Sequence, residues 1–183
     1  KALYQHVECQ RSNWYNTATS NIRLSQEQAF TIAAIMYPEF VKSEEWLSEG
    51  ASAIANQLET QFLEDGVHNE FDISYHFGDT GLAAFTELFS IVSANDKLSL
   101  FPSDYKDKLY RATQFMKDVI YPNYSVDNFN DTRSQRVTKS VLLKNFRTYS
   151  SMFPEDPELM WIANQGAVGT KPSYRSKSYP AGG

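Results

Sequence analysis

Apolar residues recur every three or four positions along much of this chain, the spacing that gathers them on one face of an α-helix. The pattern predicts helices over 25–36, 43–62, 82–92, 102–119, 141–153 and 157–163. Proline or glycine interrupts it between these segments, as at Pro38, Gly66 and Pro122. No segment alternates strongly enough to indicate a strand, so the chain is predicted to be all-α, with successive helices paired as antiparallel hairpins. A solenoid and a closed ring of hairpins both fit this pattern.

Polar residues of suitable type stand where several of these helices would begin. Ser25 and Gln28 have the spacing of a capping box, in which each side chain bonds the other residue's backbone N–H. Ser43 precedes two glutamates, which are favourable near the positive end of a helix. Asp156 followed by Pro157 is typical of a first helical turn. These residues predict the starts of three helices.

Two long segments, 66–81 and 121–138, show neither helical nor strand spacing. Loops of this length in a compact domain are usually functional or disordered. After Gly166 the chain consists mainly of Gly, Pro, Ser, Lys and Tyr without periodicity, as a linker does. The sequence therefore predicts a helical domain over 1–166 and a linker over 167–183.

The composition narrows the class of protein. The chain has 183 residues, of which 42% are hydrophobic and 21% charged, as in a single globular domain. A formal net charge of −5 argues against general nucleic-acid binding. No apolar run reaches the roughly 18 residues that a membrane span requires. The single cysteine, Cys9, excludes internal disulfides and cysteine-rich zinc sites, and is expected to be a partly buried free thiol.

Charged residues are unevenly distributed along the chain. The stretch 44–65 holds six acidic residues and no Lys or Arg, whereas 133–147 holds five basic residues and no acid. A polyanionic ligand would favour the basic stretch, although a solvated helix face explains it equally simply. Aromatic residues make up 14% of the chain and include 11 tyrosines, which permits sugar binding without requiring it.

Chemically versatile side chains gather in three polar clusters, at 11–15, 65–76 and 128–133. The chain has no glycine-rich phosphate loop, no nucleophile elbow and no pair of histidines at metal-binding helical spacing. His68 and His76, with Glu70 or Asp72, are a conceivable zinc set, but no further ligand stands at a fixed spacing. Neither a metal nor a cofactor is therefore predicted.

Several short segments follow one another in a particular order over residues 13–76. They are Asn13-Trp14, Tyr37-Pro38-Glu39-Phe40-Val41-Lys42, Trp46, and the stretch from Gln61 to His76 that contains Asp65-Gly66 and Tyr75-His76. In this order and spacing the chain resembles the N-terminal helical domain of the heparinase II/III family of polysaccharide lyases. Trp14 stands where some members have histidine, which makes the heparinase III-like members the nearer relatives. Tyr37 in place of phenylalanine, and Asp72-Ile73 in the last segment, depart from the usual motif.

The resemblance implies a fold, a reaction and two catalytic residues. The fold would be part of an incomplete (α/α) toroid. The reaction would be β-elimination on a uronic-acid polysaccharide, with a heparan-sulfate-like substrate preferred over alginate. Asn13 would stabilise the charge that develops on the uronate carboxylate when the C5 proton leaves, because an amide donates hydrogen bonds without a competing charge. Tyr75 would transfer protons as base, acid or both, provided that cationic neighbours favour its phenolate.

Four further residues are assigned to substrate binding by the same resemblance: Trp14, His76, Glu70 and Arg133. His76 and the basic stretch would supply the positive field around Tyr75, and His76 would orient Tyr75 or the substrate. Glu70 would brace its loop or bind a sugar hydroxyl, since a carboxylate beside a polyanion otherwise repels it. Each residue also has an ordinary structural explanation, such as a capping role for an asparagine.

The resemblance also implies a C-terminal β-sandwich domain, absent from this chain, that contributes a further catalytic residue. The chain alone is therefore expected to show weak or no lyase activity, and the intact protein to be periplasmic or secreted. No nucleic-acid or membrane partner is expected. Three alternatives stay open: a non-catalytic module that binds acidic glycans, an alginate or oligoalginate lyase, and a hairpin scaffold for protein partners. Convergence of Asn13, Tyr75 and His76 on one cleft would favour the glycan-related functions.

Overall fold

The computed structural model describes residues 1–16, 20–78, 81–127, 130, 137–173 and 176–182. Within these ranges it contains α1 (Ala2–Ser12), α2 (Asn21–Met36), α3 (Ser43–Gln61), α4 (Ile73–Phe77), α5 (Leu82–Ala94), the 3₁₀ turn η1 (Leu98–Leu100), α6 (Tyr105–Val119), α7 (Lys139–Met152) and α8 (Pro157–Ala163). The β-type pairing in this part of the chain is an isolated bridge between Phe62 and His68. The prediction of an all-α chain is confirmed. None of the described helices is long and apolar enough to cross a membrane.

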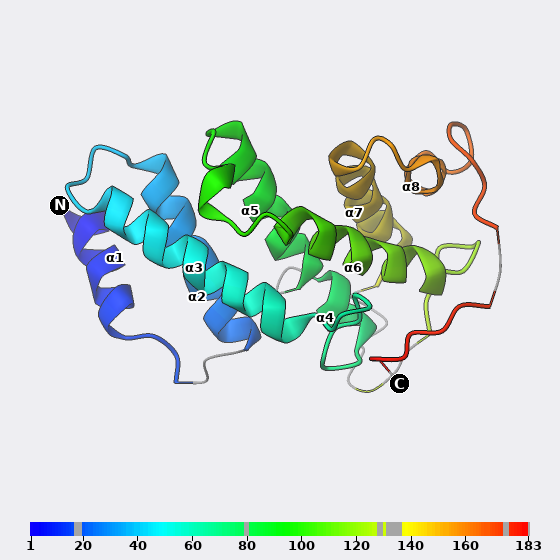
Figure 1. Ribbon diagram of the computed structural model, residues 1–183, viewed down its shortest axis with the longest axis horizontal. Helices are drawn as coiled ribbons and strands as arrows, with labels where there is room; N and C mark the ends of the chain where they lie inside the picture. The colour runs from blue at the N-terminus through cyan, green and yellow to red at the C-terminus, as the bar shows by residue number, and fades with distance from the viewer. Residues whose placement is uncertain (17–19, 79–80, 128–129, 131–136, 174–175, 183) are drawn as a thin grey trace.

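The helices form an elongated array that follows the order of the sequence (Figure 1). It begins with α1 at one end, continues through the antiparallel hairpin of α2 and α3, passes α5 and α6, and finishes with α7 and α8. The α2–α3 and α7–α8 pairs are the most extensively packed. The pairs α2–α3 and α7–α8 are hairpins of the predicted kind, while α5 packs against α2, α6 and α7.

Helix starts agree with the sequence patterns in part. Asp156 caps α8 as predicted, because its Oδ1 accepts from the backbone N–H groups two and three residues later at 2.9 and 3.1 Å. The α2 cap is Ser20, which accepts from the N–H three residues on at 3.2 Å, and not Ser25, whose hydroxyl donates back into the helix. Ser43 is the first residue of α3, and its hydroxyl donates to the carbonyl of Pro38 at 2.9 Å. Because Ser20 and not Ser25 caps α2, the prediction of a capping box at Ser25 and Gln28 was wrong.

Two helices lie where the apolar spacing predicts none. α1 buries only Val7 among its 11 residues, so it presents no apolar stripe to detect. It is held by Glu8, which accepts from the Trp46 indole at 2.6 Å and from the Lys42 ammonium at 2.6 Å, and by the Tyr4 ring, which packs against that of Trp46 with centroids 5.1 Å apart. α4 has five residues, which is too short for a periodic pattern.

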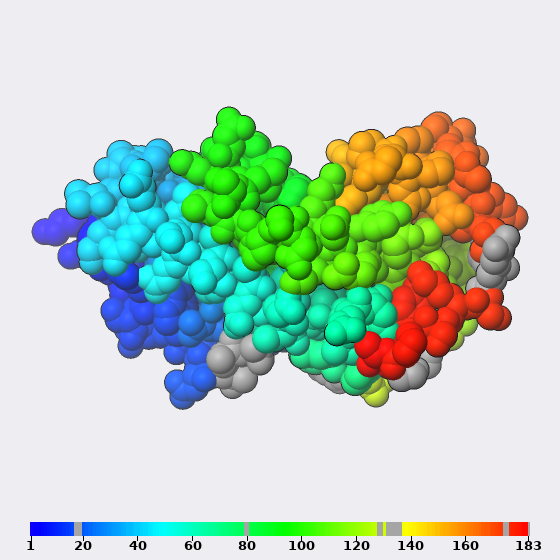
Figure 2. Space-filling model, viewed as in Figure 1, coloured from blue at the N-terminus to red at the C-terminus, as the bar shows by residue number. Residues whose placement is uncertain are grey.

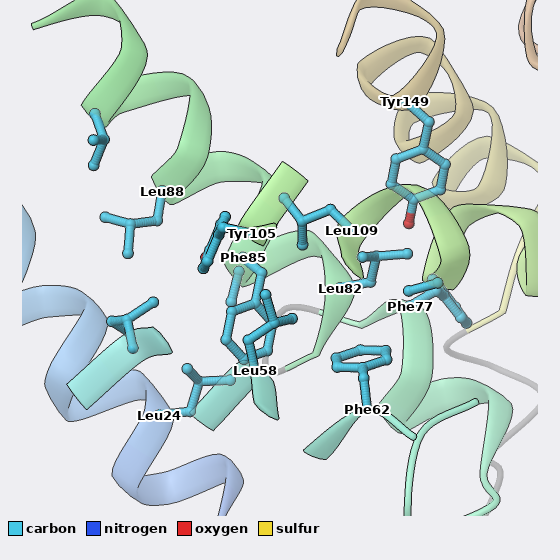
Figure 3. Close-up of a cluster of buried hydrophobic side chains, with 14 of the residues drawn as sticks. Leu24, Leu58, Phe62, Phe77, Leu82, Phe85, Leu88, Tyr105, Leu109 and Tyr149 are labelled. Atoms are coloured by element: carbon cyan, nitrogen blue, oxygen red, sulfur yellow. The ribbon is translucent and has the colours of Figure 1, made fainter. Parts of the chain in front are cut away.

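A continuous apolar core runs through the array and joins helices from both halves of the sequence (Figure 3). Its central side chains are buried residues of α2, α3, α4, α5, α6 and α7, among them Leu24, Leu58, Phe77, Leu82, Phe85, Leu88, Leu109 and Tyr149. Phe62, just after α3, packs edge-on against Phe85 with ring centroids 5.7 Å apart. This contact holds the segment that leads into α4 against the core.

The turn after α3 fits tightly against α6 because of one glycine. Gly66 has φ +88°, a conformation that L side chains rarely adopt. A Cβ atom at this position would lie 2.4 Å from the backbone carbonyl of Arg111 in α6. Glycine therefore permits both the turn and its close approach to α6, and thereby sets where the loop to α4 begins.

Candidate active site and its surroundings

The short helix α4 carries Tyr75 between the α3–α4 loop and α5. Asp72 caps the helix, because its Oδ1 accepts from the Tyr75 N–H at 3.0 Å and from the Ser74 hydroxyl at 2.6 Å. A Cβ atom on Gly81 would lie 1.9 Å from the Tyr75 carbonyl oxygen, so the following turn packs directly on the helix. Tyr75 itself is partly exposed. Its backbone is thus held rigidly while its side chain stays accessible.

Both histidines of this segment are buried and hydrogen-bonded. His76 is 1% exposed, and its Nε2 donates to the Ala112 carbonyl at 3.0 Å, since a carbonyl oxygen can only accept. The Nδ1 of His68 accepts from the Glu70 N–H at 3.2 Å, which leaves its proton on Nε2, 3.3 Å from Gln61 Oε1. Each ring is therefore assigned the tautomer with the proton on Nε2.

Burial keeps these two imidazoles uncharged at neutral pH. It lowers the pKa of His76 to about 3. It also lowers the pKa of His68 to about 4, with the Asp72 carboxylate opposing that shift. The expectation that a charged His76 favours the Tyr75 phenolate is therefore wrong. Direct contact between His76 and a substrate stays a prediction.

Asn13 and Trp14 directly follow α1 and are engaged locally. Asn13 is exposed, and its amide nitrogen donates to the Cys9 carbonyl at 2.8 Å and to the Cys9 sulfur at 3.9 Å. Trp14 packs edge-on against Phe30 with ring centroids 5.2 Å apart, and the Arg23 guanidinium lies 4.4 Å from the centroid of its ring. Cys9 is exposed, contrary to the expected partial burial.

A second asparagine, Asn21, opens α2 at the end that faces α4. Gln28 of α2 lies beside Ala84 of α5, to whose carbonyl it donates at 3.4 Å, and the two helices run in the same direction (Figure 1). Asn21 precedes Gln28 by about two turns, so it lies at the end of α2 on the side where α5 begins. α1, which leads to Asn13, lies on the other side of α2 in Figure 1. The apolar spacing did not identify Asn21 as the first residue of α2. Ser20, which caps this helix, is the sequence signal that could have placed the helix start there.

The second and third polar clusters meet through Asn130. Its amide donates to the carbonyl oxygens of Glu70 and Phe71 at 3.2 and 2.8 Å. Glu70 is exposed, and its backbone is bonded at both ends, by His68 and by Asn130. The predicted role of the Glu70 side chain stays untested, and Arg133 lies outside the described residues.

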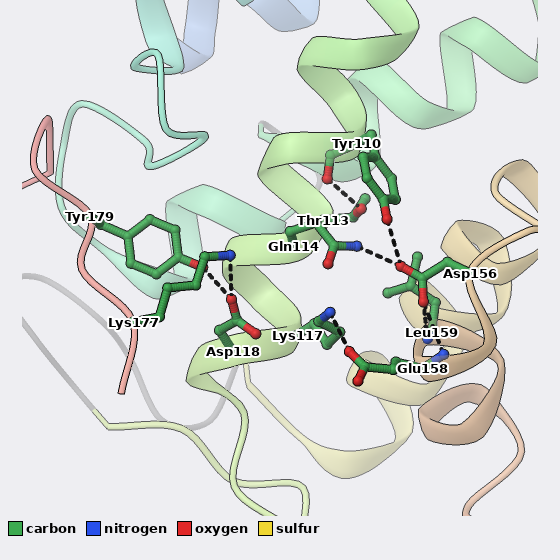
Figure 4. Close-up of polar contacts among 10 residues, drawn as sticks. All are labelled: Tyr110, Thr113, Gln114, Lys117, Asp118, Asp156, Glu158, Leu159, Lys177 and Tyr179. Carbon is green, nitrogen blue, oxygen red and sulfur yellow. Dashed lines mark hydrogen bonds and ion pairs between the residues drawn. The ribbon is translucent and has the colours of Figure 1, made fainter. Parts of the chain in front are cut away.

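The segment 176–182, here called the strap, lies against the body of the domain rather than apart from it (Figure 2). The Lys177 ammonium and the Tyr179 hydroxyl both donate to Asp118 Oδ2 of α6, at 2.7 and 2.5 Å (Figure 4). Two backbone N–H groups at the end of the strap donate to Asp65 Oδ2, at 2.9 and 3.1 Å. Part of the predicted linker is thus bonded to the helical body at two points.

The described residues contain no group of three His, Cys, Asp or Glu side chains placed to share a metal ion. His68 and His76 have ring centroids 6.5 Å apart, and each uses Nε2 in a bond to protein. Their arrangement therefore gives no support to the conceivable zinc set.

Residues 1–161 match the family model described as the heparinase II/III N-terminus. The chain belongs to the heparinase II/III family. It is 35% identical over 158 residues to a heparin-sulfate lyase of Bacteroides thetaiotaomicron, covering 82% of this chain and 22% of that protein. A heparin-sulfate lyase of Bacteroides stercoris is 28% identical, with 89% and 24% covered.

Solved structures agree with this family assignment. A heparinase III structure has a TM-score of 0.83 and 26% identity, with 96% of this chain and 27% of that one covered. The heparan sulfate lyase from Pedobacter heparinus has a TM-score of 0.82 at 21% identity, with 96% and 26% covered, and shows the same fold. The prediction of helical hairpins from an (α/α) toroid is confirmed. The chain spans about a quarter of the length of these relatives.

Most residues of the heparinase II/III motif build the fold in this chain. Trp46 is fully buried, Gly66 shapes a turn, and Gln61 and His76 are buried and hydrogen-bonded. Of the residues of α4, Ser74 and Tyr75 keep partial exposure, and Tyr75 has the side chain suited to proton transfer. Most motif residues therefore stabilise the fold around the short helix that carries Tyr75.

Proposed function

We propose that the whole protein to which this chain belongs is a polysaccharide lyase that cleaves a heparan-sulfate-like acidic polysaccharide by β-elimination. The carrying observation is the likeness of 96% of the chain to heparinase III at a TM-score of 0.83, beside 35% identity to a heparin-sulfate lyase. Because the chain spans about a quarter of those relatives, the proposal concerns the intact protein. A C-terminal β-sandwich domain would complete its site. We further propose that the intact protein acts in the periplasm or outside the cell.

The proposed reaction requires two proton transfers and stabilisation of one developing charge. A base takes the proton from C5 of the uronate, the C4–C5 double bond forms, and the C4–O4 bond breaks. The glycosidic oxygen leaves with the bond electrons and receives a proton. Negative charge grows on the uronate carboxylate as the C5 proton departs, so hydrogen-bond donors aimed at that carboxylate lower the barrier.

Tyr75 is proposed to carry both protons in turn. Tyr75 is partly exposed, and the Asp72 cap and the Gly81 turn fix its backbone. An ordinary tyrosine has a pKa near ~10, so the phenolate must be stabilised by positive charge when substrate binds. Since His76 and His68 are uncharged, that charge must come from basic side chains elsewhere in the intact protein.

Two asparagines, Asn13 and Asn21, are candidates for the amide that would stabilise the uronate carboxylate. Asn13 is the candidate of the motif, whereas Asn21 stands at the end of α2 nearer to α4. In the full-length protein we expect Asn21→Ala to lower kcat by about 100-fold, as loss of a donor to a developing oxyanion does. Asn13→Ala is the matched control and should lower it less than about tenfold. A larger loss of kcat in Asn13→Ala than in Asn21→Ala would instead assign the stabilising amide to Asn13.

The proposed function is tested by a product assay on the full-length protein with heparan sulfate, alginate and hyaluronan. Formation of the C4–C5 double bond is followed by ultraviolet absorbance. We expect the full-length protein to form product faster from heparan sulfate than from alginate or hyaluronan. The 183-residue chain alone should form little or no product. Salt-sensitive glycan binding without product in the full-length protein would instead indicate a non-catalytic glycan-binding module. Preferential cleavage of alginate would contradict the proposed substrate class.

A further inference from the structure

The strap is bonded to the helical body through two carboxylates, each of which accepts two hydrogen bonds. Asp118 Oδ2 accepts from the Lys177 ammonium at 2.7 Å and from the Tyr179 hydroxyl at 2.5 Å (Figure 4). Asp65 Oδ2 accepts from two successive backbone N–H groups near the end of the strap, at 2.9 and 3.1 Å. Because an ionised acceptor makes stronger hydrogen bonds than a neutral one, the strap is held at two separate points.

Asp118 lies in the last turn of α6, where the helix itself disfavours an acidic residue. The C-terminal end of a helix carries partial negative charge, so a carboxylate there is unfavourable for the helix. Among the described residues, the hydrogen bonds and the ion pair that Asp118 makes are those to Lys177 and Tyr179. The strap therefore accounts for this carboxylate better than α6 does.

The Tyr179 ring is packed between two other side chains. It meets the Phe115 ring of α6 edge to face, with centroids 4.9 Å apart, and the Lys177 ammonium lies 4.8 Å from its own centroid. Burial and the Asp118 carboxylate raise the pKa of Tyr179, so its hydroxyl stays protonated and keeps donating at neutral pH. Apolar packing thus supports the polar bonds that hold the strap.

The end of the strap fits closely against the turn that follows α3. A Cβ atom on Gly182 would lie 2.7 Å from Cγ2 of Val67, which is buried. Asp65 lies in the same turn, and its Oδ1 accepts from the Val67 N–H at 3.3 Å. One carboxylate therefore bonds both the turn and the strap, so the strap is placed relative to the loop that leads to α4.

The strap faces α4 across a cavity of about 640 Å³. Lys177 and Tyr179 line this cavity from the strap, and Ile73 and His76 line it from α4. Tyr75 belongs to the same five-residue helix. The position of the strap is therefore fixed relative to the helix that carries the proposed proton-transfer residue.

We propose that Asp65 and Asp118 are positioning residues, which hold the strap so that the part of the intact protein beyond it meets α4 in one orientation. The inference rests on the proposed function, in which a C-terminal domain completes the site around Tyr75. Groups from two parts of a protein must be closely aligned for catalysis, since a misplacement of about 1 Å can cost about 100-fold in rate. Two anchor points restrict a rotation of the strap that one anchor would permit.

Hydrogen exchange in the 183-residue chain tests whether the strap is held. The backbone N–H groups of Ala181 and Gly182 should exchange at least about tenfold faster in Asp65→Ala than in the unmodified chain, because they lose their acceptor. Glu64→Ala removes the same charge from the neighbouring exposed residue and should leave both rates unchanged. Equal exchange rates in Asp65→Ala and the unmodified chain would overturn the proposal.

In the full-length protein, Asp65→Ala combined with Asp118→Ala should lower kcat/KM on heparan sulfate by at least about tenfold. Alanine suits the last turn of α6, so the helix should stay intact and the unfolding temperature nearly unchanged. The asparagine pair, Asp65→Asn with Asp118→Asn, keeps an acceptor oxygen at each anchor and should recover most of the lost kcat/KM. Unchanged kcat/KM in the alanine pair, or no recovery in the asparagine pair, would overturn the proposal.

Small-angle X-ray scattering of the same full-length variants requires no turnover, so it separates this inference from the proposed function. The alanine pair should have a larger radius of gyration than the unmodified and Glu64→Ala proteins, because the part beyond the strap is no longer held in one orientation. Absence of lyase product from the unmodified protein would contradict the proposed function, while the scattering difference would still support the anchoring role. Identical scattering curves for the alanine pair and the unmodified protein would overturn that role.

Discussion

Tyr75→Phe in the full-length protein is expected to reduce kcat/KM on heparan sulfate by at least about 100-fold, the lower range for loss of a general acid or base. The substitution removes one hydroxyl and keeps the ring. The backbone of residue 75 is fixed by the Asp72 cap at 3.0 Å and by the tight Gly81 turn, and neither depends on the hydroxyl. The loss should therefore appear in kcat, with the fold intact by circular dichroism and thermal unfolding.

Tyr37→Phe is the matched control for this experiment. Tyr37 is 40% exposed and stacks on Phe40 with ring centroids 5.7 Å apart, a contact that phenylalanine preserves. The control variant should retain the kcat/KM of the unmodified protein. Near-normal turnover by Tyr75→Phe would exclude Tyr75 as the proton-transfer group. A rise in KM at constant kcat would instead make it a binding residue.

Helices with a wide apolar face could be predicted from the sequence, whereas those held by other means could not. The apolar stripe that includes Ile54 and Leu58 identified α3, and both residues are buried in the core. α1 is held instead by contacts to Trp46 in the next hairpin, from the Glu8 carboxylate and from the Tyr4 ring. Such contacts join residues far apart in the chain, so no local pattern reports them. α4 consists of one short turn capped by Asp72.

The residues assigned to the site stay a prediction, but the structure shows how each of them is held. Tyr75 and His76 lie in the short helix α4, and Asp72 caps its first turn. Residue type suggested that His76 carries charge, but burial at 1% exposure lowers its pKa to about 3 and keeps it neutral. The position of Asn21 depends on how α2 passes α5, which is a tertiary property.

The neutral histidines also make the fold sensitive to mild acid. In the unfolded chain a histidine has a pKa near ~6.5, whereas the folded chain holds His68 at about 4 and His76 at about 3. Between these values the unfolded state binds more protons, so stability falls as the pH falls below ~6.5. Well below pH 6.5 each histidine contributes about 1.4 kcal/mol per pH unit, and at pH 6.5 half of that. The pair should therefore lower the free energy of unfolding by roughly 3 kcal/mol between pH 6.5 and 5.

Urea unfolding of the 183-residue chain at a series of pH values measures this slope directly. Above pH 5 most carboxyl groups remain ionised in both states, so the slope in this window reports the histidines. His68→Gln should remove about half of it, because one of the two buried imidazoles is lost. His6→Gln alters the exposed histidine of α1 and should leave the slope unchanged. A slope of zero in the unmodified chain would mean that both imidazoles accept protons in the folded state, and the buried hydrogen bonds assigned to His68 and His76 would then be wrong.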